Sequence, residues 1–432
     1  MNRPVSSLPG TKRNSLLPEA IDKNTLITKA INMKMKRKLY VAVWGMSLLT
    51  ACSAPKTGAP EWFENAVKTS EHQLLYMAEQ LKDVPDTACF PRSTKADGSY
   101  RLENAKDWTS GFYPGSMWLA YELSGDEALA KEARRYTDRL EDIQYYTGNH
   151  DIGFMMYCSY GNALRLKPEP KDKEILINSS ESLCARFSPK IGLIRSWDFG
   201  DWSYPVIIDN MMNLEMLFWA SEQTGNSKYR DIAIAHADKT LKNHFRENMT
   251  SYHVVSYSVP SGKVESKGTF QGYADSSAWA RGQAWGVYGY TMCYRFTKNP
   301  VYLEAAHKIA RFIMENRPSG NDYIPYWDYD APDIPNAPRD ASAAAVTASA
   351  LLELYAYTED QSLSDTYIEY AENILKQLSS PDYLAKENEN KGFILMHSVG
   401  SFPHDSEVDV PLNYADYYYL EAMKRYKDLK NF

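Results

Sequence analysis

Cysteine is scarce in this chain, which has five cysteines in 432 residues. Cys89, Cys158, Cys184 and Cys293 stand far apart, in neither the C-x-x-C spacing of a zinc site nor a disulfide-dense framework. Each is more typical of a small buried apolar side chain than of a catalytic thiol. We therefore expect neither cysteine-based metal binding nor thiol catalysis.

An excess of basic residues is also absent. The chain has 48 Lys and Arg against 55 Asp and Glu, a net charge of −7, and no basic stripe interleaved with aromatic residues. This balance argues against a nucleic-acid partner. Aromatic residues are abundant instead: 32 Tyr and 10 Trp suit stacking against sugars, although most of them will pack in the core.

Several catalytic motifs are missing as well. The sequence has no H-E-x-x-H, no G-x-S-x-G and no glycine-rich phosphate loop, which excludes a metalloprotease, a serine hydrolase and a nucleotide-dependent enzyme. The acidic segment 327–340, WDYDAPDIPNAPRD, fails the calcium-loop spacing because Pro332 stands where a ligand is needed. We expect this segment to be a loop at the rim of a site.

The N-terminal segment has no apolar run long enough for a comfortable membrane span. Residues 33–52, MKMKRKLYVAVWGMSLLTAC, have a basic start, a short apolar run and small residues before Cys52, as in a secretory signal. Leu49-Thr50-Ala51-Cys52 resembles the bacterial lipobox, which implies cleavage before Cys52 and lipidation of that cysteine. We predict a leader and lipoprotein signal peptide over 1–51, a tether over 52–60, and a lipid-anchored protein in the bacterial periplasm or at the cell surface. A buried N-terminal helix is the alternative.

Helical periodicity runs through the rest of the chain, while the alternation typical of strands is rare. One class of segment is apolar on a single face, as in Leu129, Ala133, Tyr136, Leu140 and Ile143 with charged residues between them. Such amphipathic helices face solvent on their other side. They are predicted at or near 62–82, 126–143, 172–187, 228–245, 302–313 and 367–378.

A second class is apolar, aromatic or small on most faces and must be covered on both sides. Its six members, 111–123, 151–166, 209–223, 281–296, 340–357 and 413–426, alternate with the six amphipathic helices. Twelve alternating helices predict an all-α fold, a single (α/α)6 toroid over 61–432 with an inner and an outer ring. An open solenoid is the alternative, but it does not need a fully apolar inner helix in every repeat.

All inner helices of such a toroid run in one direction, so their N-termini meet at one mouth. Polar and charged residues are concentrated there: Asp107-Trp108, His150-Asp151, Asp209-Asn210, Arg281-Gly282-Gln283, Arg339-Asp340 and Asn413. Helix capping explains one or two of the Asp residues, but it does not explain the Trp, Arg, Gln and His beside them. The mouth is therefore the predicted functional site.

Asp151 and Asp209 are the candidate catalytic residues. Both stand beside apolar runs, HDIGF and VIIDNMMNL, where burial and a neighbouring carboxylate raise a pKa. One carboxyl kept protonated and one kept ionised would supply the acid and the base for sugar-bond chemistry. The alternative is that both are ordinary helix N-caps.

Candidate binding residues lie in 268–285, GTFQGYADSSAWARGQAW. Gln271 and Arg281 could hold a carboxylate or vicinal hydroxyls, and Trp285 could supply a stacking face. An Arg tied to a backbone carbonyl is the alternative. Two further stacking platforms and a hydrogen-bond partner are candidates: Trp108, Trp197 and His253.

Eight segments, in order between residues 107 and 422, resemble glycoside hydrolase family 88, the unsaturated glucuronyl hydrolases, and the similarity as a whole runs from about residue 60 to about residue 428. They are DWTSGFYPG, HDIGF, IIDNMMNL, SYH, TFQGYADSSAWARGQAWGVYG, YWDYDAP, RDASAAAVTASALLEL and DYYYLEA. The resemblance implies an (α/α)6 barrel, no metal and no cofactor. It also implies action on the unsaturated uronic acid that a polysaccharide lyase leaves at the non-reducing end of an oligosaccharide.

The resemblance further implies a reaction that is not an ordinary glycosidic displacement. An acid protonates C4 of the C4=C5 enol ether, water adds at C5, and the hemiketal collapses and releases the sugar. By this resemblance, the acid/base residue of the family matches Asp209. Its second essential carboxylate, which would stay ionised, matches Asp151. Trp108 and Trp197 match the stacking positions, and four residues match the polar contacts: His253, Gln271, Arg281 and Trp285.

The chain departs from the family over 396–412, MHSVGSFPHDSEVDVPL, a loop that resembles the part closing over the second sugar. Ser398 and Ser401 could donate hydrogen bonds to a sulfate or be plain loop serines, so chondroitin, hyaluronan, heparin-type and ulvan fragments all stay open. The expected partners are unsaturated uronide oligosaccharides of glycosaminoglycan type. Two alternatives are an unsaturated rhamnogalacturonyl hydrolase and a lipid-anchored carbohydrate-binding protein without catalysis.

Overall fold

The computed structural model describes residues 58–432. The predicted leader, the signal peptide, most of the tether and the lipidation site Cys52 lie outside the described residues. Within 58–432, none of the helices combines the length and the apolar character that a membrane span requires. The described residues belong to one compact unit.

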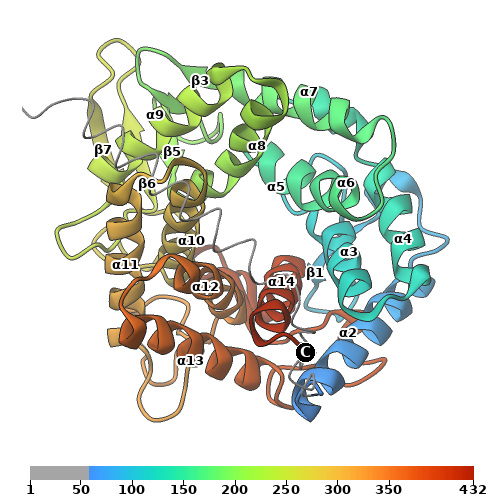
Figure 1. Cartoon of the computed structure of the whole chain (residues 1–432). Helices are drawn as coiled ribbons and strands as arrows, with labels where there is room; N and C mark the ends of the chain where they lie inside the picture. Colours follow the sequence, from blue (N-terminus) through green and yellow to red (C-terminus); the bar gives the residue numbers. More distant parts are fainter. Residues whose placement is uncertain (1–57) are drawn as a thin grey trace, which may run out of the picture. The chain divides into compact units, whose positions relative to one another are not determined.

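Six helices form the outer ring of the fold (Figure 1). They are α2 (Glu61–Gln80), α4 (Glu127–Asp138), α7 (Asp172–Cys184), α9 (Ser227–His244), α11 (Pro300–Glu315) and α13 (Gln361–Leu378). Four of them begin at an Asp or Asn whose side chain accepts a hydrogen bond from a helix N–H: Asp126, Asn226, Asn299 and Asp360. These residues are ordinary N-caps, which supply acceptors for N–H groups that have no partner within the helix.

Six helical segments alternate with these and form the inner ring. They are α3 (Phe112–Ser124), α5 (Ile152–Met156) with α6 (Asn162–Leu166), α8 (Leu214–Thr224), α10 (Ala280–Thr297), α12 (Ala341–Leu354) and α14 (Asn413–Lys430). The ring closes because α14 packs against α3, and Phe63 of α2 contacts Tyr426 and Phe432. The predicted (α/α)6 toroid is therefore confirmed, and the open solenoid is excluded.

Two inner segments are less regular than the sequence predicted. Residues 151–166 were expected as one α-helix, but a π-helical turn, η3 (Tyr157–Gly161), separates α5 from α6. Ser159 Oγ donates to the Met155 carbonyl and Asn162 Nδ2 to the Cys158 carbonyl, at 2.6 and 2.8 Å, and such side-chain bonds loosen the helical ladder. The segment before α8 is likewise a 3-10 helix, η4 (Ile208–Asn213).

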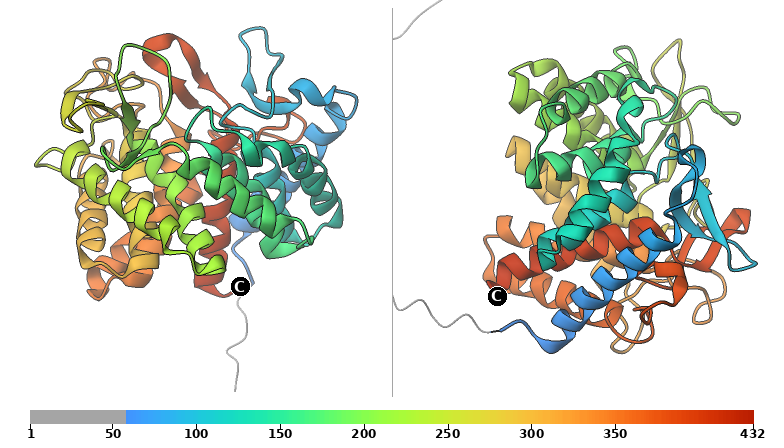
Figure 2. Two further views of the ribbon diagram at one scale, coloured as in Figure 1. Left: turned by 90° about the horizontal axis from the view of Figure 1, so that it is seen from above. Right: turned by 90° about the vertical axis from the view of Figure 1, so that its right-hand side faces the viewer.

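Four small antiparallel sheets, which the sequence did not predict, lie in the segments that connect the helices. They pair β1 (Phe90–Thr94) with β2 (Tyr100–Glu103), β3 (Phe187–Ser188) with β4 (Leu193–Ile194), and β8 (Ser398–Ser401) with β9 (Ser406–Val410); the fourth has the order β5 (Pro205–Ile207), β6 (Val254–Tyr257), β7 (Val264–Gly268). Strands of two to five residues are too short for apolar alternation to stand out in the sequence. Figure 2 shows these strands and the long loops at one end of the toroid, with the C-terminus at the other.

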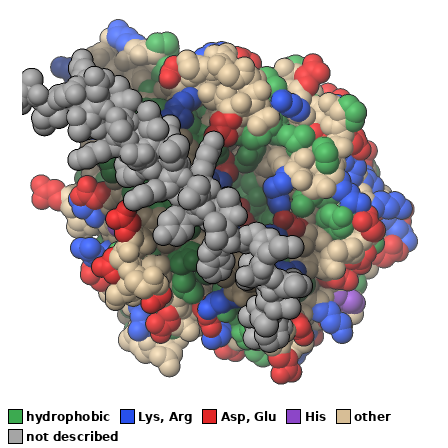
Figure 3. Space-filling view, in the orientation of Figure 1, with side chains coloured by type: hydrophobic (Ala, Val, Ile, Leu, Met, Phe, Trp, Pro, Cys, Tyr) green, Lys and Arg blue, Asp and Glu red, His purple; other side chains and the backbone are tan. Residues whose placement is uncertain are grey.

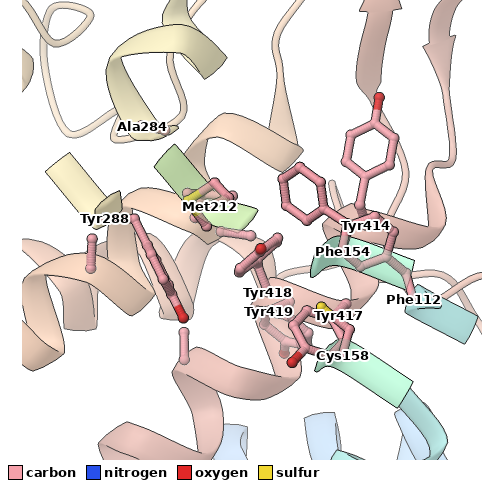
Figure 4. Close-up of a cluster of buried hydrophobic side chains, with 14 of the residues drawn as sticks. Phe112, Phe154, Cys158, Met212, Ala284, Tyr288, Tyr414, Tyr417, Tyr418 and Tyr419 are labelled. Carbon is pink, nitrogen blue, oxygen red and sulfur yellow. The ribbon is translucent and has the colours of Figure 1, made fainter. Parts of the chain in front are cut away.

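The centre of the toroid is filled by aromatic side chains from the inner helices (Figure 4). Phe154 contacts Phe112 and Trp285, with ring centroids 5.3 and 5.4 Å apart, and Trp285 contacts Tyr418 at 5.4 Å. Offset and edge-on aromatic contacts of this kind stabilise a core beyond the area that they bury. Phe154 also contacts Trp108, at 5.6 Å, so the stack forms the floor of the mouth where the inner helices begin.

The opposite end of the toroid holds a separate cavity of about 420 Å³. Its charged residues are paired: Arg295 contacts Glu215 and Glu353 at 2.8 and 3.1 Å, and Arg425 contacts Glu353 at 2.9 Å. Cations are stabilised there by the negative ends of the inner helices. Acidic and basic side chains are interspersed on the face shown in Figure 3 as well. This end holds neither candidate catalytic carboxyl.

Candidate active site

A cavity of about 370 Å³ lies at the mouth where the inner helices begin. Six of the predicted site residues line it: Trp108, Asp151, Trp197, Asp209, Gln271 and Ser401. They come from the loops before α3, α5, α8, α10 and α14, which are far apart in the sequence. The toroid therefore brings both candidate acids to the same cavity, as the alternating helices predicted. Four predicted residues do not line the cavity: His253, Arg281, Trp285 and Ser398.

Neither candidate acid is a helix cap. Asp151 directly precedes α5, but its side chain accepts no hydrogen bond from the helix. Asp209 lies inside η4 and its Oδ2 is buried without a hydrogen-bond partner. Asp340 provides the contrast, because its Oδ1 accepts from the backbone N–H of Ser342 at 3.0 Å and caps α12. The N-cap alternative is right for Asp340 and wrong for Asp151 and Asp209.

Close backbone packing fixes the two acids relative to each other. A Cβ atom on Gly153 would lie 2.6 Å from the Cα of Asn213, so only glycine permits this approach. The N–H of Phe154 donates to Asn213 Oδ1 at 2.8 Å across the same contact. Because Gly153 follows Asp151 and Asn213 follows Asp209, this contact joins the start of α5 to η4 and positions both acids.

Burial raises the pKa of both carboxyl groups. Asp209 is 7% exposed, and its pKa rises to about 7, although the charge of Arg281 and the indole of Trp285 lower it. The pKa of Asp151 rises well above its usual range, first through burial and then through the negative charge of Asp209. The sequence predicted a raised pKa for one of the two acids, whereas burial raises the pKa of both. Desolvation favours the neutral form of Asp151 as well, so its expected ionised state stays a prediction.

Each acid has a buried histidine beside it. His150 Nε2 lies 3.3 Å from Asp151 Oδ1, and His253 Nε2 lies 3.6 Å from Asp209 Oδ2. Burial holds the pKa of His150 well below its usual value and lowers that of His253 to about 3, with a further contribution from Arg281. Both rings are therefore neutral near neutral pH. His253 contacts the acid from behind the cavity wall and was missed in that role.

Arg281 does not reach the cavity, which corrects its predicted role in holding a substrate carboxylate. Its guanidinium is fully buried and donates to Asp340 at 2.9 Å, to the Gly400 carbonyl at 2.6 Å and to the Val399 carbonyl. Gln271 Nε2 donates to the same Gly400 carbonyl at 3.0 Å. The alternative of an Arg tied to carbonyls is thus correct here, and both side chains hold β8 over the mouth.

Two other residues that were predicted to bind the substrate, Trp285 and Ser398, also do not line the cavity. Trp285 is fully buried in the aromatic floor, where it packs against Phe154 rather than offering a face to a ligand. Ser398 is fully buried on β8, so the packed strand separates its hydroxyl from the cavity. Ser401 does line the cavity, and its Oγ lies 2.7 Å from His404 Nδ1.

Aromatic side chains form one wall of the cavity. Trp197 stacks on Phe199 with ring centroids 4.8 Å apart and an interplanar angle of 16°. Phe270 contacts Trp197 at 5.7 Å and His404 at 4.2 Å. Phe199 is 53% exposed, so its outer face is available to a ligand. Trp197 was predicted as a platform, whereas the other three rings were missed because nothing in their local sequence distinguishes them from core aromatics.

Charged residues of the cavity were also missed. Arg92 of β1 donates to both carboxylate oxygens of Glu407 on β9, at 2.7 and 2.8 Å, and to Asp107 at 3.0 Å. Lys106 lines the cavity from the loop before Trp108. No signal in the sequence paired β1 with β9, because both strands are short and lie at opposite ends of the chain. Within 58–432, no cluster of three or more His, Cys, Asp or Glu side chains is arranged to hold a metal ion.

A cavity that holds two carboxyl groups and has aromatic rings along one wall is typical of a glycoside hydrolase. The sequence pattern of Glycosyl Hydrolase Family 88 matches residues 87–317. An unsaturated glucuronyl hydrolase of Formosa agariphila is 43% identical over 91% of this chain and 99% of its own length. An unsaturated chondroitin disaccharide hydrolase of Streptococcus pyogenes is 33% identical over 78% of this chain and 86% of its own.

A solved structure shows the same fold. The crystal structure of an unsaturated glucuronyl hydrolase specific for heparin superposes with a TM-score of 0.83 and 50% sequence identity, over 87% of this chain and 99% of that one. This chain belongs to glycoside hydrolase family 88.

Proposed function

We propose that this enzyme is an exo-acting hydrolase that removes the 4,5-unsaturated uronic acid from the non-reducing end of lyase-generated oligosaccharides of glycosaminoglycan type. The observation that carries the proposal is the meeting of Asp151 and Asp209 in one aromatic-walled cavity at the mouth of the toroid. The relatives named as unsaturated glucuronyl and chondroitin disaccharide hydrolases support the same substrate class.

The first step is protonation of the sugar at C4. In an unsaturated uronide, the ring oxygen donates electrons into the C4=C5 bond, which makes C4 nucleophilic. Asp209 is the proposed acid, because burial raises its pKa to about 7 and leaves it partly protonated near neutrality. Transfer of its proton to C4 leaves a positive charge at C5 that the ring oxygen shares.

The second step is addition of water at C5. Asp209, now ionised, takes a proton from the attacking water, and a hemiketal forms at C5. Cleavage of the bond between C5 and the ring oxygen gives a ketone and leaves a hemiacetal at C1. That hemiacetal breaks down and releases the next sugar, so the glycosidic bond is broken without displacement at C1.

Asp151 is proposed to hold the sugar hydroxyls. Burial favours the neutral form of Asp151, but sugar hydroxyl groups that donate hydrogen bonds to it would favour the ionised form. An ionised Asp151 would in turn keep the proton on Asp209, because two neighbouring negative charges are unfavourable. We thus propose that substrate binding completes the division of roles, with Asp209 as the protonated acid and Asp151 as the ionised carboxylate.

Deuterium labelling tests this reaction directly. In D2O, hydration places one deuterium at C4 of the released keto sugar, and the ultraviolet absorbance of the conjugated double bond disappears. An ordinary displacement at C1 would release the second sugar first and leave the absorbance of the free unsaturated sugar, which would be lost only later, when its ring opens and its enol takes a deuterium at C4. Mass spectrometry of the product and the absorbance record together distinguish the two reactions.

Substitution of the acids tests their roles. Asp209→Asn is expected to lower kcat at least a thousandfold, and Asp151→Asn is expected to lower kcat and raise KM. Asp126→Asn, at the ordinary N-cap of α4, is the matched control and should leave both parameters nearly unchanged. Unaltered turnover in Asp209→Asn would contradict the assignment of the acid.

The same assay distinguishes two other functions from the proposed one. Turnover only of pectin-derived unsaturated fragments would identify a rhamnogalacturonyl hydrolase instead. Binding of unsaturated uronides without turnover, unchanged in Asp209→Asn, would identify a carbohydrate-binding protein. Desolvation raises the pKa of both acids, an arrangement that favours catalysis over simple binding.

We also propose lipid anchoring at Cys52, in the periplasm or at the cell surface, from the lipobox-like sequence Leu49-Thr50-Ala51-Cys52. Metabolic labelling with a fatty-acid analogue in a bacterial host should mark the full-length chain, and Cys52→Ser should abolish the label and release the protein from the membrane fraction. Membrane association that survives this substitution would contradict the proposal.

A further inference from the structure

The substrate proposed above carries a carboxylate and often sulfates, so the cavity needs a cation to receive an anionic group. Two arginines near the mouth are unavailable. The guanidinium of Arg92 is bound on both edges by Glu407 and Asp107, and that of Arg281 is buried behind the wall with Asp340 and two backbone carbonyls. Positive charge that is already paired contributes little attraction to a further anion.

The buried histidines do not fill this role either. His150 and His253 are neutral near neutral pH because burial disfavours their charged forms. His253 is also committed through Nδ1, which accepts the backbone N–H groups of Phe270 and Gln271 at 3.0 and 3.1 Å. The imidazole of His404 directs its Nδ1 to the hydroxyl of Ser401.

Lys106 is different from these residues. It lines the cavity, its side chain is exposed, and it forms no ion pair with any carboxylate of residues 58–432. Its neighbour Asp107 is held away by Arg92 at 3.0 Å and by the N–H and hydroxyl of Thr109 at 2.9 and 2.6 Å. Its ammonium group makes a weak contact with the ring of Tyr146, whose centroid is 5.9 Å away.

The backbone of this loop is ordered, so Lys106 is presented at a fixed place. The N–H of Lys106 donates to Asn104 Oδ1 at 2.8 Å, and the N–H of Asp107 donates to the Asn104 carbonyl at 3.1 Å. Trp108 follows directly and packs on Phe154 and Tyr414. The flexible stem of Lys106 therefore starts from a fixed position in the wall of the cavity that the two acids also line, and can bring its ammonium group to a ligand there.

We infer that Lys106 is a specificity-determining residue that binds the anionic group of the substrate, a carboxylate or a sulfate. The inference rests on the proposed function for its substrate class. The ammonium group donates hydrogen bonds to the anion's oxygens, and its charge attracts the substrate to a mouth whose other cations are neutralised or buried. The contact forms in the ground state and the transition state alike, so its loss raises KM and spares kcat.

Lys106→Gln tests the inference, with Lys106→Arg as the conservative variant. Four substrates are compared: an unsulfated unsaturated disaccharide, its uronate methyl ester, and the same disaccharide sulfated on either sugar. We expect KM of Lys106→Gln to rise about tenfold for each substrate that carries the bound anion, with kcat within twofold, and Lys106→Arg to restore KM. Added salt should raise the KM of the parent enzyme more than that of Lys106→Gln.

The substrate panel identifies the anion. If Lys106 binds the uronate carboxylate, Lys106→Gln and the parent enzyme will have the same KM for the methyl ester. If it binds a sulfate, the effect of the substitution will be confined to one sulfated disaccharide. Lys95→Gln, an exposed lysine of the β1–β2 turn outside the cavity, is the matched control. An unchanged KM of Lys106→Gln for every anionic substrate overturns the inference.

Binding separates this inference from the proposed function. Titration with each fragment in the Asp209→Asn background, with and without Lys106→Gln, gives affinities without turnover when it is followed by tryptophan fluorescence, to which Trp108 and Trp197 of the cavity wall contribute. A parent protein that binds but does not hydrolyse the fragments contradicts the proposed function alone. A Lys106→Gln protein that binds them as tightly as the parent contradicts the inference alone.

Discussion

His253 and Asp209 face each other behind the cavity, with Nε2 of the histidine 3.6 Å from Oδ2 of the acid. The Nδ1 atom accepts backbone N–H groups from Phe270 and Gln271, so it carries no proton and the ring's proton lies on Nε2. The N–H of the ring is therefore on the nitrogen nearest Asp209, although 3.6 Å is too long for a hydrogen bond to Oδ2. The histidine itself is bound to the loop that carries Phe270 of the aromatic wall.

The pH dependence of activity should report Asp209 rather than His253. Asp209 must be protonated to act, and its pKa is raised to about 7 by burial, so kcat/KM should fall as the pH rises through about 7, tenfold per pH unit above it. His253, with a pKa lowered to about 3, stays neutral throughout. Steady-state rates across the neutral range in parent and His253→Gln enzymes test this, since disappearance of the falling limb in the variant would assign it to the histidine.

Replacement of Asp209 should stabilise the protein while it destroys activity. The folded-state pKa of about 7 lies above the ordinary value of 3.8, so the folded protein holds a proton that the unfolded chain releases between these values. The free energy of unfolding therefore falls as the pH rises from about 4 to about 7, and the loss persists at higher pH. Asp209→Asn removes this penalty and should raise the stability at mildly alkaline pH by a few kcal/mol, roughly.

Denaturant unfolding of the parent and Asp209→Asn proteins at two pH values measures this effect. The difference in the free energy of unfolding should vanish near pH 4, where both forms are neutral at this position. A variant that is less stable than the parent at alkaline pH would show that Asp209 supports the fold, as a cap would.

The sequence predicted the parts of the molecule that depend on periodicity. Six fully apolar helices alternating with six amphipathic ones could be recognised, because burial on all sides constrains every residue of a helix. Up-and-down alternation then placed Asp151 and Asp209 at one mouth, and the structure confirms that both line one cavity. The π-helical turn after α5 leaves the segment apolar on most of its faces, so periodicity does not register it.

The parts that depend on side-chain direction could not be predicted. Arg281 and Ser398 stand in segments that reach the mouth, but their side chains point into the wall, where Arg281 binds carbonyls of the strand that carries Ser398. A raised pKa does not by itself identify a carboxyl group of the active site either. Burial raises the pKa of Asp416 to about 8, yet its oxygens accept the N–H groups of Ile394 and Leu395 at 3.0 and 2.8 Å, away from the cavity.

Gly153→Ala should disturb the relative position of the two acids. The new Cβ would lie 2.6 Å from the Cα of Asn213, a distance that forces the start of α5 away from η4. We expect a loss of roughly 1–3 kcal/mol in stability, the usual cost of overpacking, and a fall of at least a hundredfold in kcat through misplacement of Asp151. Gly161→Ala is the matched control, because its Cβ would meet the side chain of Tyr157 at 3.1 Å, where a ring can move. Equal activity in the two variants would argue against the packing contact as the device that positions the acids.

Phe199→Ala should reveal where the second sugar binds. Phe199 lines the cavity, is 53% exposed and stacks on Trp197, so its free face is available to a sugar outside the buried part of the site. Because an exposed ring adds little to the core, the substitution should change the stability by less than about 1 kcal/mol. Stacking against a sugar would make KM for an unsaturated disaccharide rise about five- to tenfold, while a methyl glycoside of the unsaturated uronic acid, which lacks the second sugar, should be hydrolysed equally by both enzymes. A parallel rise for both substrates would instead place Phe199 against the unsaturated ring itself, and Phe199→Leu, which keeps apolar bulk without an aromatic face, distinguishes stacking from simple burial.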